Sequence, residues 1–266
     1  MTDDDPTDAT EPSPGACLRD LGNELRAWTG FAPTGRWDML AAELPLLHRT
    51  STPERLLGEP SLIPGDGAPS RAVLGTSGCV FFWVGRQSYD ARLVLVWEAS
   101  VEQGPPDGFG APWDTGGLMS KGTLGTTLDA FGAREAIARY SLPLGEYREY
   151  LSMVIETCFA EPSACWDVGG RPTKWYPGYV RAPDQIPELP AQTFEVRRAG
   201  PVEVGPGLLA AVADESWFCD QPRVLRELKQ VVRRHRATWW APRPAEPPHV
   251  AAMRFVEDFL RKRGLA

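Results

Sequence analysis

Leu46-Leu47-His48-Arg49-Thr50-Ser51 is the stretch from which the fold of this chain is most readily inferred. Two apolar residues lead into a His-x-Thr sequence, a pattern typical of the end of a β-strand. Since alternate residues of a strand share a face, we expect the His48 imidazole and the Thr50 hydroxyl to point the same way. His48 is one of only three histidines in the chain, which makes it a candidate functional residue.

Three further stretches predict strands. The run Gly78-Cys79-Val80-Phe81-Phe82-Trp83-Val84-Gly85 has a continuous apolar centre, which indicates a strand buried on both faces. Residues 91–97 are rich in branched and aromatic side chains and predict the next strand. A polar loop over residues 85–90 joins these two. Thr193-Phe194-Glu195-Val196-Arg197 alternates in character, so it places the Glu195 carboxylate on a late strand.

The remaining segments are predicted from periodicity and from turn residues. Helical spacing predicts helices at residues 18–30, 37–43, 128–140, 144–159, 223–236 and 250–262, and a helical turn beginning at Pro53. Strand character extends over residues 195–204, whereas residues 208–213 are ambiguous between helix and strand. Segments rich in glycine or proline predict loops at residues 103–125, 161–191 and 242–248.

The composition is ordinary for a globular protein. Of 266 residues, 42% are hydrophobic and 24% are charged, which is enough for one substantial core. Residues 1–15 combine several acidic residues with proline, threonine and alanine, and they predict a disordered acidic tail. We expect residues 16–266 to form a single domain with helical additions at its N- and C-terminal ends.

Charge limits the classes of partner. A net charge of −7 argues against a general nucleic-acid-binding protein, which normally has a basic surface. One late segment has the opposite bias. A solvated helix face is the simplest interpretation of this segment, and attraction of a polyanionic target is the alternative. Its basic residues are Arg223, Arg226, Lys229, Arg233, Arg234 and Arg236.

Cysteine and histidine usage gives no indication of a metal site. The five cysteines are odd in number and form no CxxC pair, and the three histidines are scattered. We therefore predict that no metal is required. The chain starts without the basic and apolar segments of a signal peptide, and it has no apolar run of membrane-spanning length. From these features we expect a cytoplasmic protein without a membrane partner.

A histidine, an aromatic strand and a late strand glutamate match the chemical needs of an enzyme that splits NAD. Breaking the nicotinamide–ribose bond builds positive, oxocarbenium-like charge on the ribose. A nearby carboxylate stabilises that charge. A side chain that holds the ribose and an aromatic ring that stacks on nicotinamide supply positioning. Residues of these types are His48, Glu195 and the group Phe81, Phe82 and Tyr89.

These motifs resemble the ADP-ribosyltransferase superfamily, in its histidine-bearing branch of the diphtheria toxin and poly(ADP-ribose) polymerase type. The resemblance covers about residues 44–213. It implies an α+β fold with split, mostly antiparallel β-sheets around a cleft that binds NAD as a substrate. It also implies roles for five residues: ribose binding by His48 with Thr50 nearby, catalysis by Glu195, and nicotinamide stacking by one of two aromatic residues. These are Phe81, which stands in place of the family's first tyrosine, and Tyr89, a loose match to its second tyrosine.

The acceptor of ADP-ribose stays open in the sequence. Thr193 lies two residues before Glu195, so the Glu-x-Glu form of arginine-modifying toxins in the other branch is absent. We therefore do not expect arginine modification. Another protein side chain, a nucleic acid or a small molecule are possible acceptors, and hydrolysis of NAD is a further possibility. The oligomeric state is not indicated.

Two other classes of function compete with this hypothesis. Asp114-Thr115-Gly116 is the tripeptide of aspartic proteases, but the possible second copy around Asp167 lacks the hydroxyl residue. Such proteases need two facing aspartates, so we interpret residues 113–117 as a turn that flanks the cleft. The stronger alternative is a non-enzymatic interaction or immunity-type protein that uses its aromatic surface and its basic C-terminal helix. That alternative predicts no binding of NAD.

Overall fold

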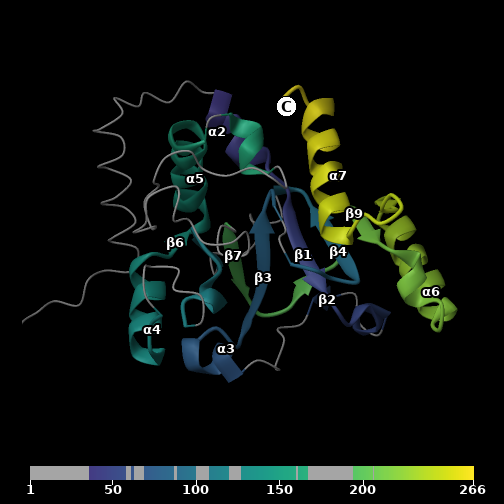
Figure 1. The fold of residues 1–266 in the computed structure, drawn as a ribbon, viewed down its shortest axis with the longest axis horizontal. Helices are drawn as coiled ribbons and strands as arrows, with labels where there is room; N and C mark the ends of the chain where they lie inside the picture. Colours follow the sequence, from purple (N-terminus) through teal and green to yellow (C-terminus); the bar gives the residue numbers. More distant parts are fainter. Residues whose placement is uncertain are drawn as a thin grey trace, which may run out of the picture.

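A large, mostly antiparallel sheet forms the centre of the computed structural model, which describes residues 36–57, 61–62, 69–86, 89–99, 108–119, 127–159, 161–166, 194–205 and 207–266. The eight strands lie in the order β10-β9-β4-β1-β3-β7-β5-β6 (Figure 1). β10 is parallel to β9, and the other pairings within this sheet are antiparallel. The strands are β1 (Leu46–Thr50), β3 (Cys79–Val84), β4 (Leu93–Trp97), β5 (Gly108–Ala111), β6 (Leu142–Pro143), β7 (Glu195–Ala199), β9 (Leu208–Ala213) and β10 (Thr238–Trp240).

Helices flank both ends of this sheet. α4 and α5 lie near β5 and β6, whereas α6 and α7 lie near β9 and β10 (Figure 1). The prediction of an α+β fold with a mostly antiparallel sheet and helices near both ends of the chain is confirmed. The helices are α2 (Arg36–Glu43), α3 (Pro69–Leu74), α4 (Ala130–Arg139), α5 (Leu144–Cys158), α6 (Pro222–Arg234) and α7 (Pro248–Lys262). A separate two-stranded sheet pairs β2 (Ser61–Leu62) with β8 (Val202–Glu203).

β1 and β3 are joined at one end only. Two residue pairs connect them, Leu46 with Val84 and Leu47 with Trp83, whereas five pairs connect β1 to β4 and five connect β3 to β7. Beyond Leu47 the two strands diverge, as Figure 1 shows. The predicted pair of split sheets is therefore corrected: the split is a local opening between β1 and β3, within one continuous sheet.

The strand register defines which side chains share a face. Trp83 lies directly opposite both Leu47 and Glu195, and Glu195 lies opposite Ala111. Directly opposed residues of antiparallel strands point to the same side, and we call this side the Glu195 face. Gly110 points to the other side, where a side chain at this position would meet the Tyr147 ring. α5 therefore covers the face opposite Glu195.

The helices of the C-terminal part belong to the core. Ala251, Ala252, Val256 and Leu260 on α7 are fully buried, and α7 packs on β4 and β9. A helix whose apolar stripe is buried in this way stabilises the sheet beneath it.

The predictions for helices are confirmed more closely than those for the weaker strands. α2, α4, α5, α6 and α7 begin and end within two residues of the predicted bounds. The ambiguous segment 208–213 is strand β9. The predicted strand at 195–204 is interrupted at Gly200 (φ 72°), which separates β7 from β8. The predicted helix at 18–30 and the tail at 1–15 lie outside the described residues.

Two strands, β5 and β10, lie where the sequence predicts no strand. The predicted loop at 103–125 includes β5 and the 3-10 turn Thr115–Gly117. Its strand sequence, Gly-Phe-Gly-Ala, has low strand propensity. Small residues are needed there because Leu144 and Tyr147 of α5 pack against the backbone at Gly108 and Gly110. Ahead of the proline-rich linker, β10 was also missed, since three residues are too few to show alternation.

Candidate functional site

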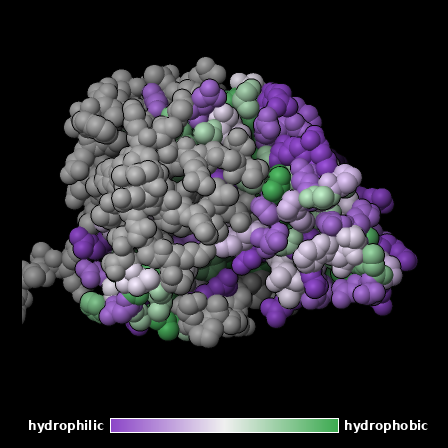
Figure 2. Space-filling view, in the orientation of Figure 1, coloured by the Kyte–Doolittle hydropathy of each residue, from purple (hydrophilic) through white to green (hydrophobic). Residues whose placement is uncertain are grey.

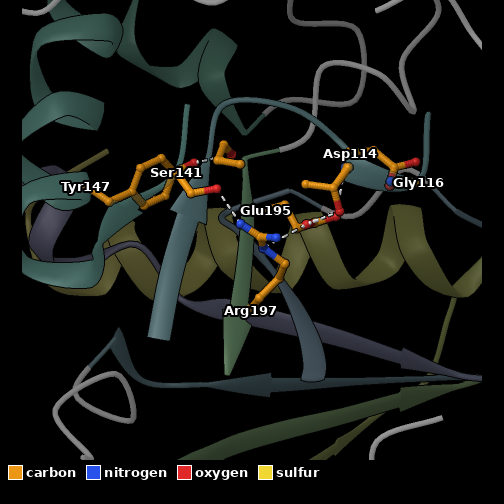
Figure 3. Close-up of polar contacts among 8 residues, drawn as sticks. Asp114, Gly116, Ser141, Tyr147, Glu195 and Arg197 are labelled. Atoms are coloured by element: carbon orange, nitrogen blue, oxygen red, sulfur yellow. Dashed lines mark hydrogen bonds and ion pairs between the residues drawn. The ribbon is translucent and has the colours of Figure 1, made fainter. Parts of the chain in front are cut away.

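Glu195 is the buried carboxylate at the centre of the candidate site. It begins β7, with only 1% of its surface exposed, and pairs across the strands with Trp83 on one side and Ala111 on the other. The Thr115 backbone N–H donates to Oε2 at 3.1 Å, and the Thr115 hydroxyl donates to Oε1 at 2.7 Å. Two bonds from one residue fix the carboxyl group in a single orientation (Figure 3).

Asp114 supplies a second carboxylate beside the first. It is the N-cap of the 3-10 turn Thr115–Gly117, where its Oδ1 accepts a hydrogen bond from the Gly116 N–H at 3.0 Å. Its Oδ2 accepts a hydrogen bond from the Tyr89 hydroxyl. The cap therefore positions Thr115 toward Glu195 and leaves Asp114 half-buried next to the same group.

The two carboxylates resist being charged together. Burial is the main cause that raises the pKa of Glu195 to about 8, and the neighbouring Asp114 raises it further. Arg197 and the two hydrogen bonds from Thr115 act in the opposite direction. A proton on one of two neighbouring carboxyl groups is the arrangement expected where like charges meet with little access to water. At neutral pH the empty site thus favours a protonated Glu195.

Arg197 is the cation that borders this pair. It lies two residues after Glu195 on the same strand face, and its Nε is 3.6 Å from Glu195 Oε1. Its other end is held by a hydrogen bond from the guanidinium to the Ser141 hydroxyl. Both Arg197 and Ser141 are buried, so the guanidinium has a fixed position beside the carboxylates, as Figure 3 shows.

Tyr89 and Trp83 form an aromatic border on the Glu195 face. Their ring centroids are 5.8 Å apart, and the Arg49 guanidinium lies 4.8 Å from the Tyr89 ring. Burial, and then Asp114, raise the pKa of the Tyr89 phenol, so this group stays protonated and donates to Asp114. The Trp83 indole N–H is buried and has no hydrogen-bond acceptor among the described residues.

His48 and Thr50 lie on the other face of the sheet. Leu47 shares the Glu195 face through its pairing with Trp83, so alternation turns His48 and Thr50 the opposite way. In agreement, the His48 ring packs against Phe82 and Trp97, at centroid distances of 5.6 Å and 6.3 Å. The shared orientation predicted for His48 and Thr50 fits this alternation.

The His48 ring is held in one tautomer. Its Nδ1 lies 2.8 Å from the Phe81 carbonyl oxygen, which can only accept, so Nδ1 carries the proton. Burial lowers the pKa of His48 to about 4, and the bond to the Phe81 carbonyl opposes this change. The neutral ring spans the opening between β1 and β3 and presents Nε2 as an acceptor.

Of the five predicted site residues, three share a face. Phe81, two residues before Trp83, points to the Glu195 face, where the Arg71 guanidinium lies 4.5 Å from its ring. Tyr89 contacts Trp83 and Asp114 there. The structure thus brings Phe81, Tyr89 and Glu195 to one side and places His48 and Thr50 on the other. The roles predicted for the five residues stay predictions.

Sequence reasoning missed Asp114, Thr115 and Arg197 as partners of Glu195. The Asp-Thr-Gly tripeptide is predicted to lie in a turn, and the structure confirms this turn; the sequence does not predict its hydrogen bonds to Glu195. The second position of the protease hypothesis, Asp167, lies outside the described residues. The sequence could have predicted Arg197 as a partner of Glu195. The two charged residues stand at positions i and i+2 of one strand, so their side chains share a face.

The described residues hold neither a metal-binding cluster nor a membrane-spanning helix. Within them, no three His, Cys, Asp or Glu side chains gather closely enough to hold a metal ion. Nor does any helix in this part of the chain have the length and apolar character needed to cross a membrane. No protein-family model matches the chain, and no curated protein sequence matches it significantly.

Proposed function

We propose that this protein cleaves the nicotinamide–ribose bond of NAD at Glu195 and transfers ADP-ribose to an acceptor or to water. The observation that carries the proposal is the buried carboxylate of Glu195, fixed by two hydrogen bonds from Thr115. It begins the strand next to the one that holds Phe81, which in turn lies next to the strand of His48. The three strands that carry the family-like motifs are thus neighbours at the centre of the sheet.

The environment of Glu195 suits a reaction that builds positive charge. Burial and Asp114 disfavour its ionised form in the empty site. Positive charge that develops on a ribose beside it would offset both effects and favour ionisation. An interaction that strengthens as the reaction proceeds lowers the barrier more than one already present with the bound substrate.

The bond changes balance without a redox partner. The bond between ribose C1 and the nicotinamide nitrogen breaks, and its electron pair leaves with nicotinamide, which becomes neutral. The acceptor or water forms the new bond to C1 and gives up a proton. Asp114 is half-buried and adjacent, so its carboxylate is the proposed base for that proton.

In this proposal His48 binds the ribose and takes no part in the bond changes. Its protonated Nδ1 is occupied by the Phe81 carbonyl, so only Nε2 is left for a ribose hydroxyl, which would donate to it. The contact requires the ligand to reach the opening between β1 and β3. Replacement of His48 by alanine is therefore expected to weaken NAD binding as well as turnover, because it removes a contact made before the chemical step.

The decisive experiment measures nicotinamide release from NAD by the wild type and by Glu195→Gln. The glutamine keeps the size of the side chain but removes its charge, and we expect turnover to fall about 10²–10³-fold. Release of nicotinamide is the same for transfer and for hydrolysis, so the assay does not depend on the acceptor. Glu203→Gln is the matched control, because Glu203 is exposed on β8 and outside the cluster; it should keep wild-type turnover.

Two results would contradict the proposal. One is turnover close to wild type in Glu195→Gln. The other is the absence of any rise in melting temperature when NAD is added to the wild type, since a ligand that binds the folded state stabilises it by mass action. Absence of NAD binding and turnover is the result that a non-enzymatic interaction protein predicts.

A further inference from the structure

The exposed face of α6 carries a row of arginines without acidic partners. In the part of the chain that the structure describes, none of them forms an ion pair. The arginines near α7 behave differently, because each of these is paired. The unpaired set is Arg226, Arg233, Arg234 and Arg236; the paired set is Arg254 with Glu246, Arg261 with Glu257 and Asp258, and Arg263 with Glu43 and Glu98.

Two acidic residues near α6 are already engaged by other cations. Glu227 accepts from Arg223 at 2.7 Å, and Glu215 lies 2.6 Å from Lys229. The four remaining arginines thus form a local excess of positive charge in a chain whose net charge is −7. We call these four residues the α6 arginine row.

Arg236 has a strained backbone conformation. It has φ 57°, and the Ala237 N–H donates to the Val232 carbonyl at 3.0 Å across the end of α6. This is the helix-ending turn in which glycine is favoured, because side chains disfavour the left-handed region. The helix dipole favours cations near this end, but it does not account for an arginine at the one position that suits glycine.

The shape of the row fits an extended polyanion. From Arg226 to Arg234, the last residue of α6, the helical rise covers about 12 Å, and Arg236 extends the row beyond the helix end. This length exceeds a single phosphate. Leu228 and Val232, on the opposite side of α6, are buried in the protein, so the helix has no free apolar face to insert into a membrane. Hydrophilic side chains predominate over α6 in Figure 2.

An exposed aromatic ring stands at the other end of the helix. Trp217, in the 3-10 turn Glu215–Phe218 just before α6, is 49% exposed, and the Arg92 guanidinium lies 5.6 Å from its ring. Cations that track a backbone, together with an aromatic ring on which bases stack, are the elements of sequence-tolerant binding to single strands.

We propose that α6 and Trp217 form a binding surface for single-stranded nucleic acid, with the α6 arginine row on the phosphates. This surface is distinct from the Glu195 site. β10, which packs on α6, lies five strand positions from β7 in the sheet order, a separation of about 24 Å at the usual strand spacing. The inference therefore does not depend on the proposed reaction.

The first test titrates a labelled single-stranded oligonucleotide with the full chain at several salt concentrations. Four phosphate contacts predict that log K falls with log salt at a slope of about −3. The double variant Arg226→Ala/Arg233→Ala should reduce the magnitude of this slope by about 1.4. Trp217→Ala should weaken binding at least about fivefold through lost stacking. Glu195→Gln should bind as the wild type does, which separates this test from that of the reaction.

Arg236→Gly gives the sharpest comparison. Glycine suits the turn, so the melting temperature should not fall, while the salt slope should lose about 0.7 of its magnitude. Ala245→Gly is the matched control, since Ala245 is the other described non-glycine residue with positive φ, at 62°. It relieves similar backbone strain without a change in charge, and it should bind as the wild type does.

The outcomes that overturn the proposal are equally specific. They are no salt-dependent binding of the oligonucleotide, or binding that the arginine variants leave unchanged. Equal affinity for heparin together with no effect of Trp217→Ala would also overturn it, because the partner would then be a polyanion without bases. Tight binding to anionic vesicles but not to the oligonucleotide would assign the surface to a membrane instead.

Discussion

Glu195 illustrates how a residue can oppose the stability of the fold that contains it. A carboxylate with almost no exposed surface, next to a second carboxylate, costs free energy when ionised. Thr115 and Arg197 reduce this cost but do not remove it. Groups that are unfavourable in the empty protein tend to gather at functional sites, and this is why the proposed chemistry is assigned to this cluster.

The raised pKa of Glu195 gives a prediction about stability and pH. Its folded-state pKa of about 8 lies above the ordinary value of 4.5, so the folded protein holds a proton that the unfolded chain has lost. The resulting stabilisation is fully present below about pH 4.5 and is lost as the pH rises to about 8. Relative to the wild type, Glu195→Gln should therefore gain melting temperature across this window.

The comparison requires melting curves at several pH values for the wild type, Glu195→Gln and Glu203→Gln. The exposed Glu203 serves as the control for removal of one carboxylate. A difference between wild type and Glu195→Gln that stays constant with pH, or that moves in the opposite direction, would show that the pKa of Glu195 is not raised in the folded protein.

At the scale of elements, periodicity was enough where the helices are long and amphipathic. The five helices predicted within the described residues have apolar faces that reach the core, so helical spacing marked them within two residues. β5 has no such pattern. Its glycines are needed because side chains of α5 pack against its backbone, and glycine has low strand propensity. Its existence depends on a contact that local sequence does not show.

Close packing of β5 on α5 gives a second prediction. In Gly110→Ala the new methyl group would lie 1.9 Å from Tyr147 Cδ1, a distance that no arrangement tolerates without movement. The shift would also disturb the 2.8 Å hydrogen bond from the Tyr147 hydroxyl to the Ala111 carbonyl. We expect the variant to lose about 1–3 kcal/mol of unfolding free energy in urea titrations.

Gly145→Ala is the control for this change. Gly145 lies on α5 itself, with open space around the position of a new methyl group, so alanine there should not destabilise the protein. An equal loss in both variants would mean that glycine is needed for backbone conformation and not for the contact with Tyr147.

The candidate site was predicted only in part, because strand pairing in the sheet brings together residues that are far apart in the sequence. Glu195 was singled out from its strand alone, but its partners Asp114 and Thr115 lie 80 or more residues earlier in the chain. The order β3-β7-β5 brings them together. The position of His48 on the opposite face was also not predicted. The register of strand pairing decides which residues of a strand point to a given face, and a shift of one residue moves every side chain to the other face. No single-strand pattern contains that information.

At the scale of the whole molecule, the sheet keeps its two proposed functional surfaces apart. Glu195 and Arg197 lie on β7, and Asp114 and Thr115 lie in the turn that follows β5, whereas the α6 arginine row lies beyond β10. The acidic net charge of the chain argues against general binding of nucleic acid. Local charge on one helix can nevertheless differ from the total, since exposed charges act within about 10 Å at ordinary salt concentrations.

The last prediction concerns what attaches the C-terminal helix to the rest of the molecule. Arg263, just after α7, forms ion pairs with Glu43 of α2 and with Glu98, so charge joins distant parts of the chain. These side chains are exposed, and such pairs contribute at most about 1 kcal/mol. Leu260 is fully buried, and its replacement by alanine removes contacts worth about 2–5 kcal/mol. We therefore expect Leu260→Ala to lower the urea midpoint far more than Arg263→Ala. If the two variants lost equal stability, the attachment would be electrostatic, and α7 would not be part of the core that the buried residues define.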